Sequence, residues 1–231
     1  MKTLFSLAIA LCASLSFAQS GGLNVDAKSN IFGYGVGNPD PGGGGGGLVA
    51  PTISLNAGTG RTITFTAGGS AGWAGSLVNG PDGGSFAANT NVPALGPVSG
   101  YNGPLSGMLV GLFIEAGDIS GFSAPGTLSY PNVSAYGQAS YSPGLRQVFF
   151  IGDGLTGTGS GAQQVFNVPN GASKLVLGIA DAFGFNGAAG YYNDNVGSYD
   201  VRYAAVPEPS TLIALGSIMA GLRLRKRRQS R

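Results

Sequence analysis

Side chains that could bind a cation are concentrated in one glycine-rich loop late in the chain. The loop, residues 181–199, reads D-A-F-G-F-N-G-A-A-G-Y-Y-N-D-N-V-G-S-Y. Its acidic and amide side chains are Asp181, Asn186, Asn193, Asp194 and Asn195. Calcium takes about six to eight oxygen ligands from carboxylates, amides and backbone carbonyls, and this loop is rich in all three. The composition is therefore compatible with a calcium site.

The same composition has a simpler interpretation. Asparagine, aspartate and glycine are the ordinary residues of turns, because they accept left-handed backbone geometry and hydrogen-bond their own backbone. From the residues alone, a calcium site and an ordinary polar turn both remain open.

Residues for catalysis are scarce. The chain contains no histidine, and its single cysteine, Cys12, lies in an N-terminal apolar stretch. The commonest general base, the usual Ser–His and Cys–His pairs and the usual zinc ligand are therefore missing. No paired carboxylates stand at a suggestive spacing. We predict that the protein is not an enzyme, and transition metals are less expected than calcium.

The basic character of the whole chain comes from its two ends. Between residues 19 and 206, five lysines and arginines stand against nine aspartates and glutamates, a net charge of −4. Binding to nucleic acid requires clustered cations that neutralise phosphates. We therefore expect no nucleic-acid partner.

The N-terminus has the features of an export signal. Lys2 precedes an apolar core over residues 4–15, and small residues at Ser16 and Ala18 suit a signal peptidase site. We predict a signal peptide helix over residues 1–18, with cleavage between Ala18 and Gln19. Signal peptidase is then a partner during export.

The C-terminal segment 206–231 combines a short polar motif, an apolar run and a basic end. The motif is Pro207, Glu208 and Pro209; a transmembrane helix is expected over 210–222, followed by the basic tail 223–231. Such a run partitions into lipid, and the cations stay on the cytoplasmic side. The apolar run is shorter than the ~20 residues that a helix needs to cross a bilayer. This length suits temporary attachment to the membrane before cleavage.

These three ordered parts resemble the PEP-CTERM sorting signal. That resemblance implies an exosortase as a second processing partner and transient attachment to the inner membrane. The cleaved protein would then reach the cell envelope, the outer surface or the extracellular matrix.

The region between the two signals is predicted to be all-β. Glycine supplies 43 of 231 residues, and interior glycine disfavours long helices. Short β-type segments bounded by glycine and proline cover residues 53–55, 61–66, 107–115, 146–151, 163–168, 174–179 and 198–203. Residues 19–50 are expected to form a glycine-rich lead into a β-sandwich over 51–205. Within that lead, the glycine run 42–47 is expected to be a flexible loop.

The last third of the chain carries a second resemblance. The stretches V-P-N-G-A-S-K-L-V-L-G-I-A-D and Y-Y-N-D-N-V-G-S-Y-D-V are similar to the galactose-binding-like β-sandwich, of jelly-roll type, of PA-I type galactophilic lectins. The resemblance implies Ca²⁺ bound by Asp181, Asp194 and Asn195, with sugar hydroxyls completing the shell of the ion. The chain departs from the family by an insertion around 183–189 and by lacking the galactose-binding histidine. The resemblance therefore supports calcium binding better than specificity for galactose.

Three further side chains are weaker ligand-binding candidates: Asn186, Tyr191 and Trp73. A tryptophan can stack on a sugar ring, although a lone tryptophan is more often part of the core. The first functional hypothesis is an exported module that binds carbohydrate with calcium, in contact with polysaccharide. The alternative is a structural protein of the surface or exopolysaccharide matrix that has no specific ligand.

Overall fold

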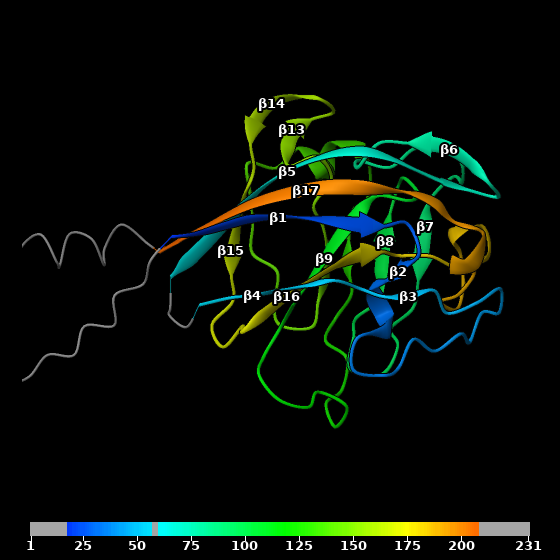
Figure 1. The fold of residues 1–231 in the computed structure, drawn as a ribbon, viewed down its shortest axis with the longest axis horizontal. Coiled ribbons are helices and arrows are strands. Elements are labelled where there is room, and N and C mark those ends of the chain that lie inside the picture. Colours follow the sequence, from blue (N-terminus) through cyan, green and yellow to red (C-terminus); the bar gives the residue numbers. More distant parts are fainter. Residues whose placement is uncertain (1–17, 57–59, 208–231) are drawn as a thin grey trace, which may run out of the picture.

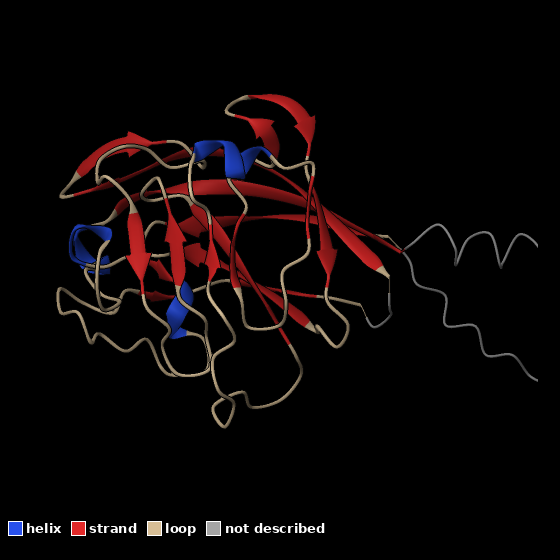
Figure 2. Ribbon diagram, turned by 180° about the vertical axis from the view of Figure 1, so that it is seen from behind, coloured by secondary structure: helices blue, strands red, loops and turns tan. Residues whose placement is uncertain are grey.

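The computed structural model describes residues 18–56 and 60–207. Within these residues the chain is built almost wholly from β-strands, joined by loops and four short 3₁₀ segments (Figure 2). The 3₁₀ segments are η1 (Ile31–Gly33), η2 (Val133–Gly137), η3 (Phe183–Phe185) and η4 (Tyr192–Asp194). The all-β prediction is confirmed.

The first large sheet has six strands in the order β1-β17-β5-β15-β11, with β6 paired to β5 (Figure 1). Its strands are β1 (Gln19–Asp26), β5 (Arg61–Trp73), β6 (Ser76–Asn79), β11 (Ser140–Tyr141), β15 (Val165–Val168) and β17 (Val196–Pro207). The centre of the sheet is the antiparallel pair of β17 and β5, in register from Val196 opposite Gly72 to Pro207 opposite Arg61.

The second large sheet also has six strands, in the order β12-β9-β16-β2-β3, with β4 paired to β16. Its strands are β2 (Ser29–Asn30), β3 (Leu48–Val49), β4 (Thr52–Ser54), β9 (Leu109–Ile114), β12 (Val148–Phe150) and β16 (Lys174–Ile179). Two small sheets complete the described region: β7 (Thr90–Val92), β8 (Tyr101–Gly103) and β10 (Leu128–Ser129) form one, and β13 (Leu155–Gly157) and β14 (Ser160–Gln163) form the other.

The two large sheets share one hydrophobic core. Phe149 of β12 lies 5.7 Å from Phe166 of β15, measured between ring centroids, and so joins one sheet to the other. All six residues of β9 are buried, as its near-continuous apolar sequence predicts for a strand covered on both faces. In β17 burial alternates instead, and Tyr199 and Val201 face the core. The arrangement is sandwich-like.

Both ends of the described chain leave the sandwich on the same side (Figure 1). Gln19, the first residue of β1, pairs with Ala205 near the end of β17. At its other end, β17 starts at Val196, directly after the 181–195 loop.

The segment 19–50 contributes strands to both large sheets: β1 belongs to the first, and β2 and β3 belong to the second. It is therefore part of the sandwich and does not only precede it.

The glycine run 42–47, expected to be a flexible loop, packs its backbone against the 188–193 segment. The backbone N–H of Tyr191 donates to the carbonyl of Gly43 at 2.7 Å, and that of Gly42 donates to the carbonyl of Ala189 at 2.9 Å. This packing uses backbone atoms, and a side chain would obstruct it: a Cβ on Gly44 would lie only 2.7 Å from the Tyr191 ring. The run is glycine-rich because two backbones approach each other here.

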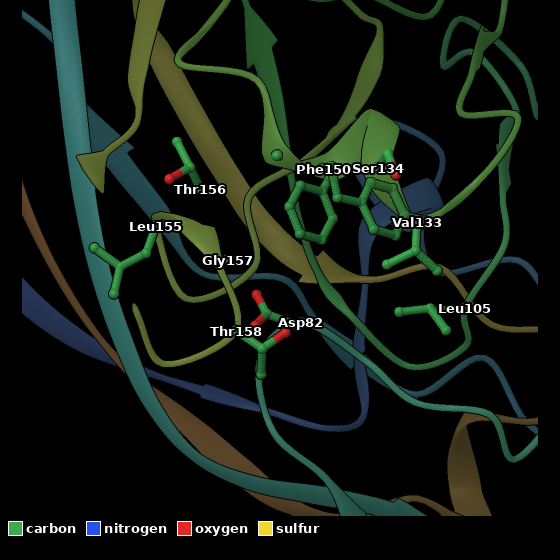
Figure 3. Close-up of a pocket in the computed structure, with 11 residues that line it drawn as sticks. Asp82, Leu105, Val133, Ser134, Phe150, Leu155, Thr156, Gly157 and Thr158 are labelled. Carbon is green, nitrogen blue, oxygen red and sulfur yellow. The ribbon is translucent and has the colours of Figure 1, made fainter. Parts of the chain in front are cut away.

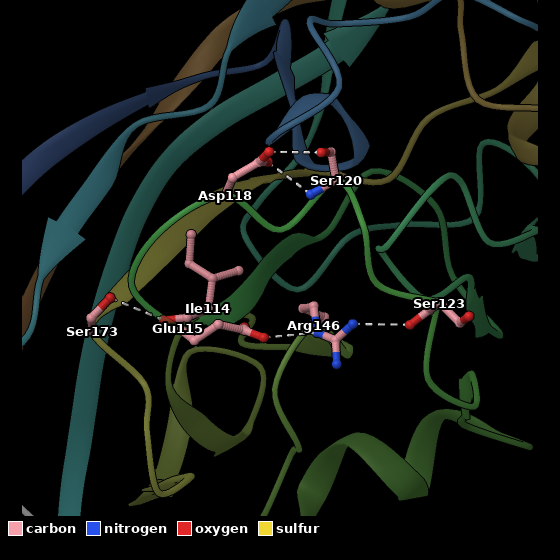
Figure 4. A network of polar contacts seen from close by, with 7 residues as sticks. All are labelled: Ile114, Glu115, Asp118, Ser120, Ser123, Arg146 and Ser173. Carbon is pink, nitrogen blue, oxygen red and sulfur yellow. Dashed lines mark hydrogen bonds and ion pairs between the residues drawn. The ribbon is translucent and has the colours of Figure 1, made fainter.

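A network around Arg146 holds the long loop after β9 (Figure 4). Arg146 Nε lies 3.2 Å from Glu115 Oε1, and its Nη1 donates to the carbonyl of Ser123 at 2.9 Å. The guanidinium also lies 4.3 Å from the centroid of the Phe122 ring. One cation, two residues before β12, thus contacts both the start of this loop at Glu115 and its later part at Phe122 and Ser123.

Most of the two predicted targeting segments lies outside the described residues. This applies to the signal peptide through residue 17, to Glu208 and Pro209 of the sorting motif, and to the predicted helix 210–222 with its basic tail. In the part of the chain that the structure describes, no helix is long and apolar enough to cross a membrane.

Candidate ligand-binding pocket

A pocket of about 240 Å³ lies where β5 ends and β17 begins. It is lined by Trp73, Ala74, Phe86, Asp181, Ala182, Phe183, Gly184, Phe185, Tyr191, Asp194 and Asn195. Five of the six side chains nominated for ligand or metal binding line this pocket. The sixth, Asn186, is exposed and is not part of the lining; its amide donates to the carbonyls of Gly184 (3.2 Å) and Asn89 (3.4 Å), and Asn89 lies outside the pocket.

Asp181 forms part of the polar wall of the pocket. It lies two residues after the end of β16 and is only 3% exposed. Its Oδ1 accepts from the backbone N–H of Ala182 at 2.8 Å, and its Oδ2 accepts from Asn195 Nδ2 at 2.8 Å. Burial raises the pKa of this carboxyl to about 7, because two hydrogen bonds do not replace full hydration. The neighbouring Asp194 carboxylate raises it further.

Asn195 links the pocket to the N-terminal part of the fold. The residue is 1% exposed, and its Nδ2 also donates to the carbonyl of Ala27 at 2.9 Å. Its Oδ1 is buried and accepts no hydrogen bond from any described residue. A buried acceptor without a donor costs about 1–3 kcal/mol. An ion, a water molecule or a ligand group at this oxygen would remove that cost.

Asp194 reaches the pocket from the 3₁₀ segment η4. Next to it, Tyr192 is fully buried and anchors the loop: its hydroxyl donates to the carbonyl of Ile179 at 2.9 Å and accepts from the N–H of Asp181 at 3.2 Å. Tyr191 adopts a left-handed backbone conformation, with φ of 66°. This turn and the Tyr192 anchor together place Asp194 and Asn195 next to Asp181.

Aromatic rings form the rest of the wall. Trp73 and Phe185 pack edge-to-face with their centroids 4.8 Å apart, and Phe183 lies 4.9 Å from Tyr191. Phe183 is 70% exposed and Phe86 is 56% exposed, so two rings stand at the surface. Trp73 is a core residue at 3% exposure, but its Nε1 has no acceptor among the described residues. Phe86, Phe183 and Phe185 were not among the site residues predicted from the sequence.

A second pocket, of about 220 Å³, includes Asp82, Leu105, Ser134, Phe150 and Thr158 (Figure 3). Asp82 Oδ1 accepts from the N–H of Asp153 at 2.8 Å, so this carboxylate supports a turn. Burial raises the pKa of Asp82. No sequence pattern marks this pocket, because its lining comes from widely separated segments. Since its carboxylate already has a structural role, the first pocket is the better candidate.

The first pocket has the right type of donors for calcium. Asp181, Asp194 and the free Oδ1 of Asn195 offer two carboxylates and one amide oxygen. Among residues 18–56 and 60–207, no three His, Cys, Asp or Glu side chains lie together so that they could hold a metal ion by themselves. A calcium ion here would therefore draw its remaining oxygens from backbone, water or ligand.

A comparison with protein-family models and with curated proteins found no match to this chain.

Proposed function

We propose that this chain is an exported, non-catalytic module that binds carbohydrate in the pocket formed by Trp73, Phe183, Tyr191 and the Asp181–Asn195 pair. The observation that carries the proposal is the meeting of exposed aromatic rings and unsatisfied buried polar atoms in one pocket. Aromatic faces pack against the apolar face of a sugar ring, and acceptors receive its hydroxyl hydrogens. Few ligand classes present both an apolar face and a rim of donors.

Calcium is part of the proposal. Asp181, Asp194 and Asn195 would hold the ion, and sugar hydroxyls would complete its shell. The ion would neutralise two carboxylates that otherwise repel each other, and it would contact the orphan Oδ1 of Asn195. The sandwich would then belong to the galactose-binding-like, jelly-roll type that the sequence resembles.

The position of the pocket suits export to a surface. Strand β17 carries Pro207 at one end and starts beside the pocket at the other, and its 12 residues span roughly 40 Å. The predicted signal peptidase site, Ala18–Gln19, lies at the Pro207 end because β1 pairs with β17 there. A chain held through its C-terminal tail would present the pocket on the side away from the membrane. That arrangement supports contact with envelope or matrix polysaccharide.

The proposal is tested with the full chain on a glycan array, with calcium and with EDTA. We expect binding to a restricted set of glycans that weakens in EDTA and on the Asp194→Ala substitution. Asn186→Ala is the matched control, since Asn186 belongs to the same loop but lies outside the pocket. A flat array in both conditions would refute the proposal and favour a structural matrix protein without a ligand.

A further inference from the structure

The charged side chains that line the pocket are both carboxylates, and no cationic side chain of the described residues lies beside them. Asp181, Asp194 and Asn195 contribute carboxylate and amide oxygens, and no lysine or arginine occurs among the described residues that line the pocket. The buried Oδ1 of Asn195 is a separate sign of a missing donor, because it has no hydrogen-bond partner in the described structure. A neutral sugar would bring donors but no charge. A positive group would supply both.

The aromatic wall favours the same kind of group. Cations are attracted to the faces of aromatic rings when they lie within about 6 Å of the ring centroid. Trp73, Phe185, Phe183 and Tyr191 line the same pocket as the carboxylates, in two pairs whose centroids are 4.8 and 4.9 Å apart. An ammonium group donates three hydrogen bonds and carries one charge, which suits an acceptor cluster bounded by rings.

We infer that the pocket selects glycan units with a free primary amine, whose ammonium occupies the Asp181–Asp194–Asn195 acceptors in place of calcium. This inference rests on the proposed carbohydrate function and names the class of sugar. It also has a consequence of its own: the ammonium and the calcium ion compete for one position. Calcium would support binding of neutral sugars and weaken binding of amino sugars.

N-acetylation is the sharpest chemical variation of such a ligand. It leaves the sugar ring and its hydroxyls in place, removes the charge and replaces a triple donor with a single amide N–H. Hydrogen bonds that involve a charged group are stronger than hydrogen bonds between neutral groups. With two carboxylates in contact with the ammonium, we expect a preference of about tenfold or more for the free amine over the acetylated sugar.

The test compares a fully deacetylated glucosamine tetramer with its fully N-acetylated counterpart and with cellotetraose. Trp73, the only tryptophan of the chain, lines the pocket and reports binding to the full chain by fluorescence. We expect the free amine to bind about tenfold more tightly than the acetylated tetramer in EDTA, and millimolar calcium to remove that advantage. Asp194→Asn should abolish the preference, since it removes an exposed carboxylate without disturbing the core.

General attraction between a cationic oligomer and an acidic protein is controlled with Asp118→Asn, which removes an exposed carboxylate from the loop after β9. This variant should keep the full preference. A preference that survives Asp194→Asn, or that Asp118→Asn reduces equally, would overturn the inference. Equal binding of all three tetramers would also overturn it while leaving the proposed carbohydrate function intact. Absence of binding by every tetramer and by the glycan array would refute both.

Discussion

The side-chain amide of Asn195 donates a 2.8 Å hydrogen bond to Oδ2 of Asp181, and this bond closes the 14-residue interval between the two ends of the pocket loop. The same amide also donates to the carbonyl of Ala27. One nitrogen therefore fixes the orientation of a buried carboxylate and ties the loop to the N-terminal segment. The geometry of the pocket depends on this pair.

Asn195→Ala should destabilise the protein. The substitution leaves Asp181 Oδ2 and the Ala27 carbonyl without their donor, and each buried unsatisfied acceptor costs about 1–3 kcal/mol. Urea denaturation should show a loss of about 2 kcal/mol or more in the free energy of unfolding. Asn186→Ala should change it by less than about 0.5 kcal/mol, because that amide lies at the surface. Equal effects would contradict the structural role of Asn195.

Asp181 should make the metal-free protein less stable as the pH rises from about 4 to 7. Its folded pKa is about 7, whereas an unfolded aspartate titrates near ~3.9, so the folded state binds the proton more tightly in this window. The stabilising contribution is complete below the unfolded pKa and is lost as the pH passes the folded pKa. Asp82, whose pKa burial also raises, acts in the same direction.

This pH dependence is measured by urea denaturation in EDTA at several pH values. The contribution of Asp181 amounts to up to a few kcal/mol. Asp181→Asn should flatten the profile between pH 4 and 7, and calcium should stabilise the wild-type protein most above pH 7, where the carboxylate is ionised. A wild-type profile that rises through this window and is unchanged in the variant would contradict the burial of Asp181.

Gly44→Ala should disturb the pocket more than Gly43→Ala. Both glycines have positive φ, 72° and 81°, so both substitutions carry backbone strain of about 1–2 kcal/mol. A Cβ at Gly44 would lie 2.7 Å from the ring of Tyr191, whereas none of the surrounding atoms lies within 4 Å of a Cβ at Gly43. The Gly44 variant should lose additional stability and ligand affinity, as measured by denaturation and by the same tryptophan titration. Equal losses of stability and affinity in the two variants would show that backbone strain alone is responsible, and would contradict the close contact of Gly44 with Tyr191.

Gly107→Ala should displace Trp73. A Cβ at this position would overlap the indole ring, and the φ of 71° already disfavours alanine. Gly117→Ala is a matched control, because Gly117 also has a positive φ, 92°, with open space around its Cβ position. The Gly107 variant should shift the tryptophan emission and lose more stability than the control. An unchanged emission spectrum would contradict the close contact of Gly107 with Trp73.

Strong apolar patterns predicted the central strands. The continuous apolar run of β9 and the alternation in β17 each identify a strand and its buried face. The sequence of β1, Q-S-G-G-L-N-V-D, has little apolar pattern. Its strand conformation is stabilised by pairing with β17, which the segment's own sequence does not encode. Local sequence could not show that pairing, which joins residues 172 to 186 positions apart, from Asp26 with Ser198 to Gln19 with Ala205.

The pocket was partly predictable for a related reason. Asp181, Asp194 and Asn195 stand close together in one loop, so their composition marks them. Phe86 comes from a distant segment and joins them only through the fold. Asn186 lies in the same loop but is not part of the lining, and its amide donates to Asn89 outside the pocket. The glycine run 42–47 was predicted to be a flexible loop, because a backbone contact with Tyr191 needs no side chains and leaves no sequence pattern.

The most direct test of the account is the titration of the full chain with calcium in the absence of sugar, followed by Trp73 fluorescence and by thermal unfolding. We predict a saturable calcium response and a higher unfolding temperature, both absent in Asp194→Ala and both retained in Asn186→Ala. A wild-type unfolding temperature that EDTA and calcium leave equal, with no change in Trp73 emission, would contradict a cation site at Asp181, Asp194 and Asn195.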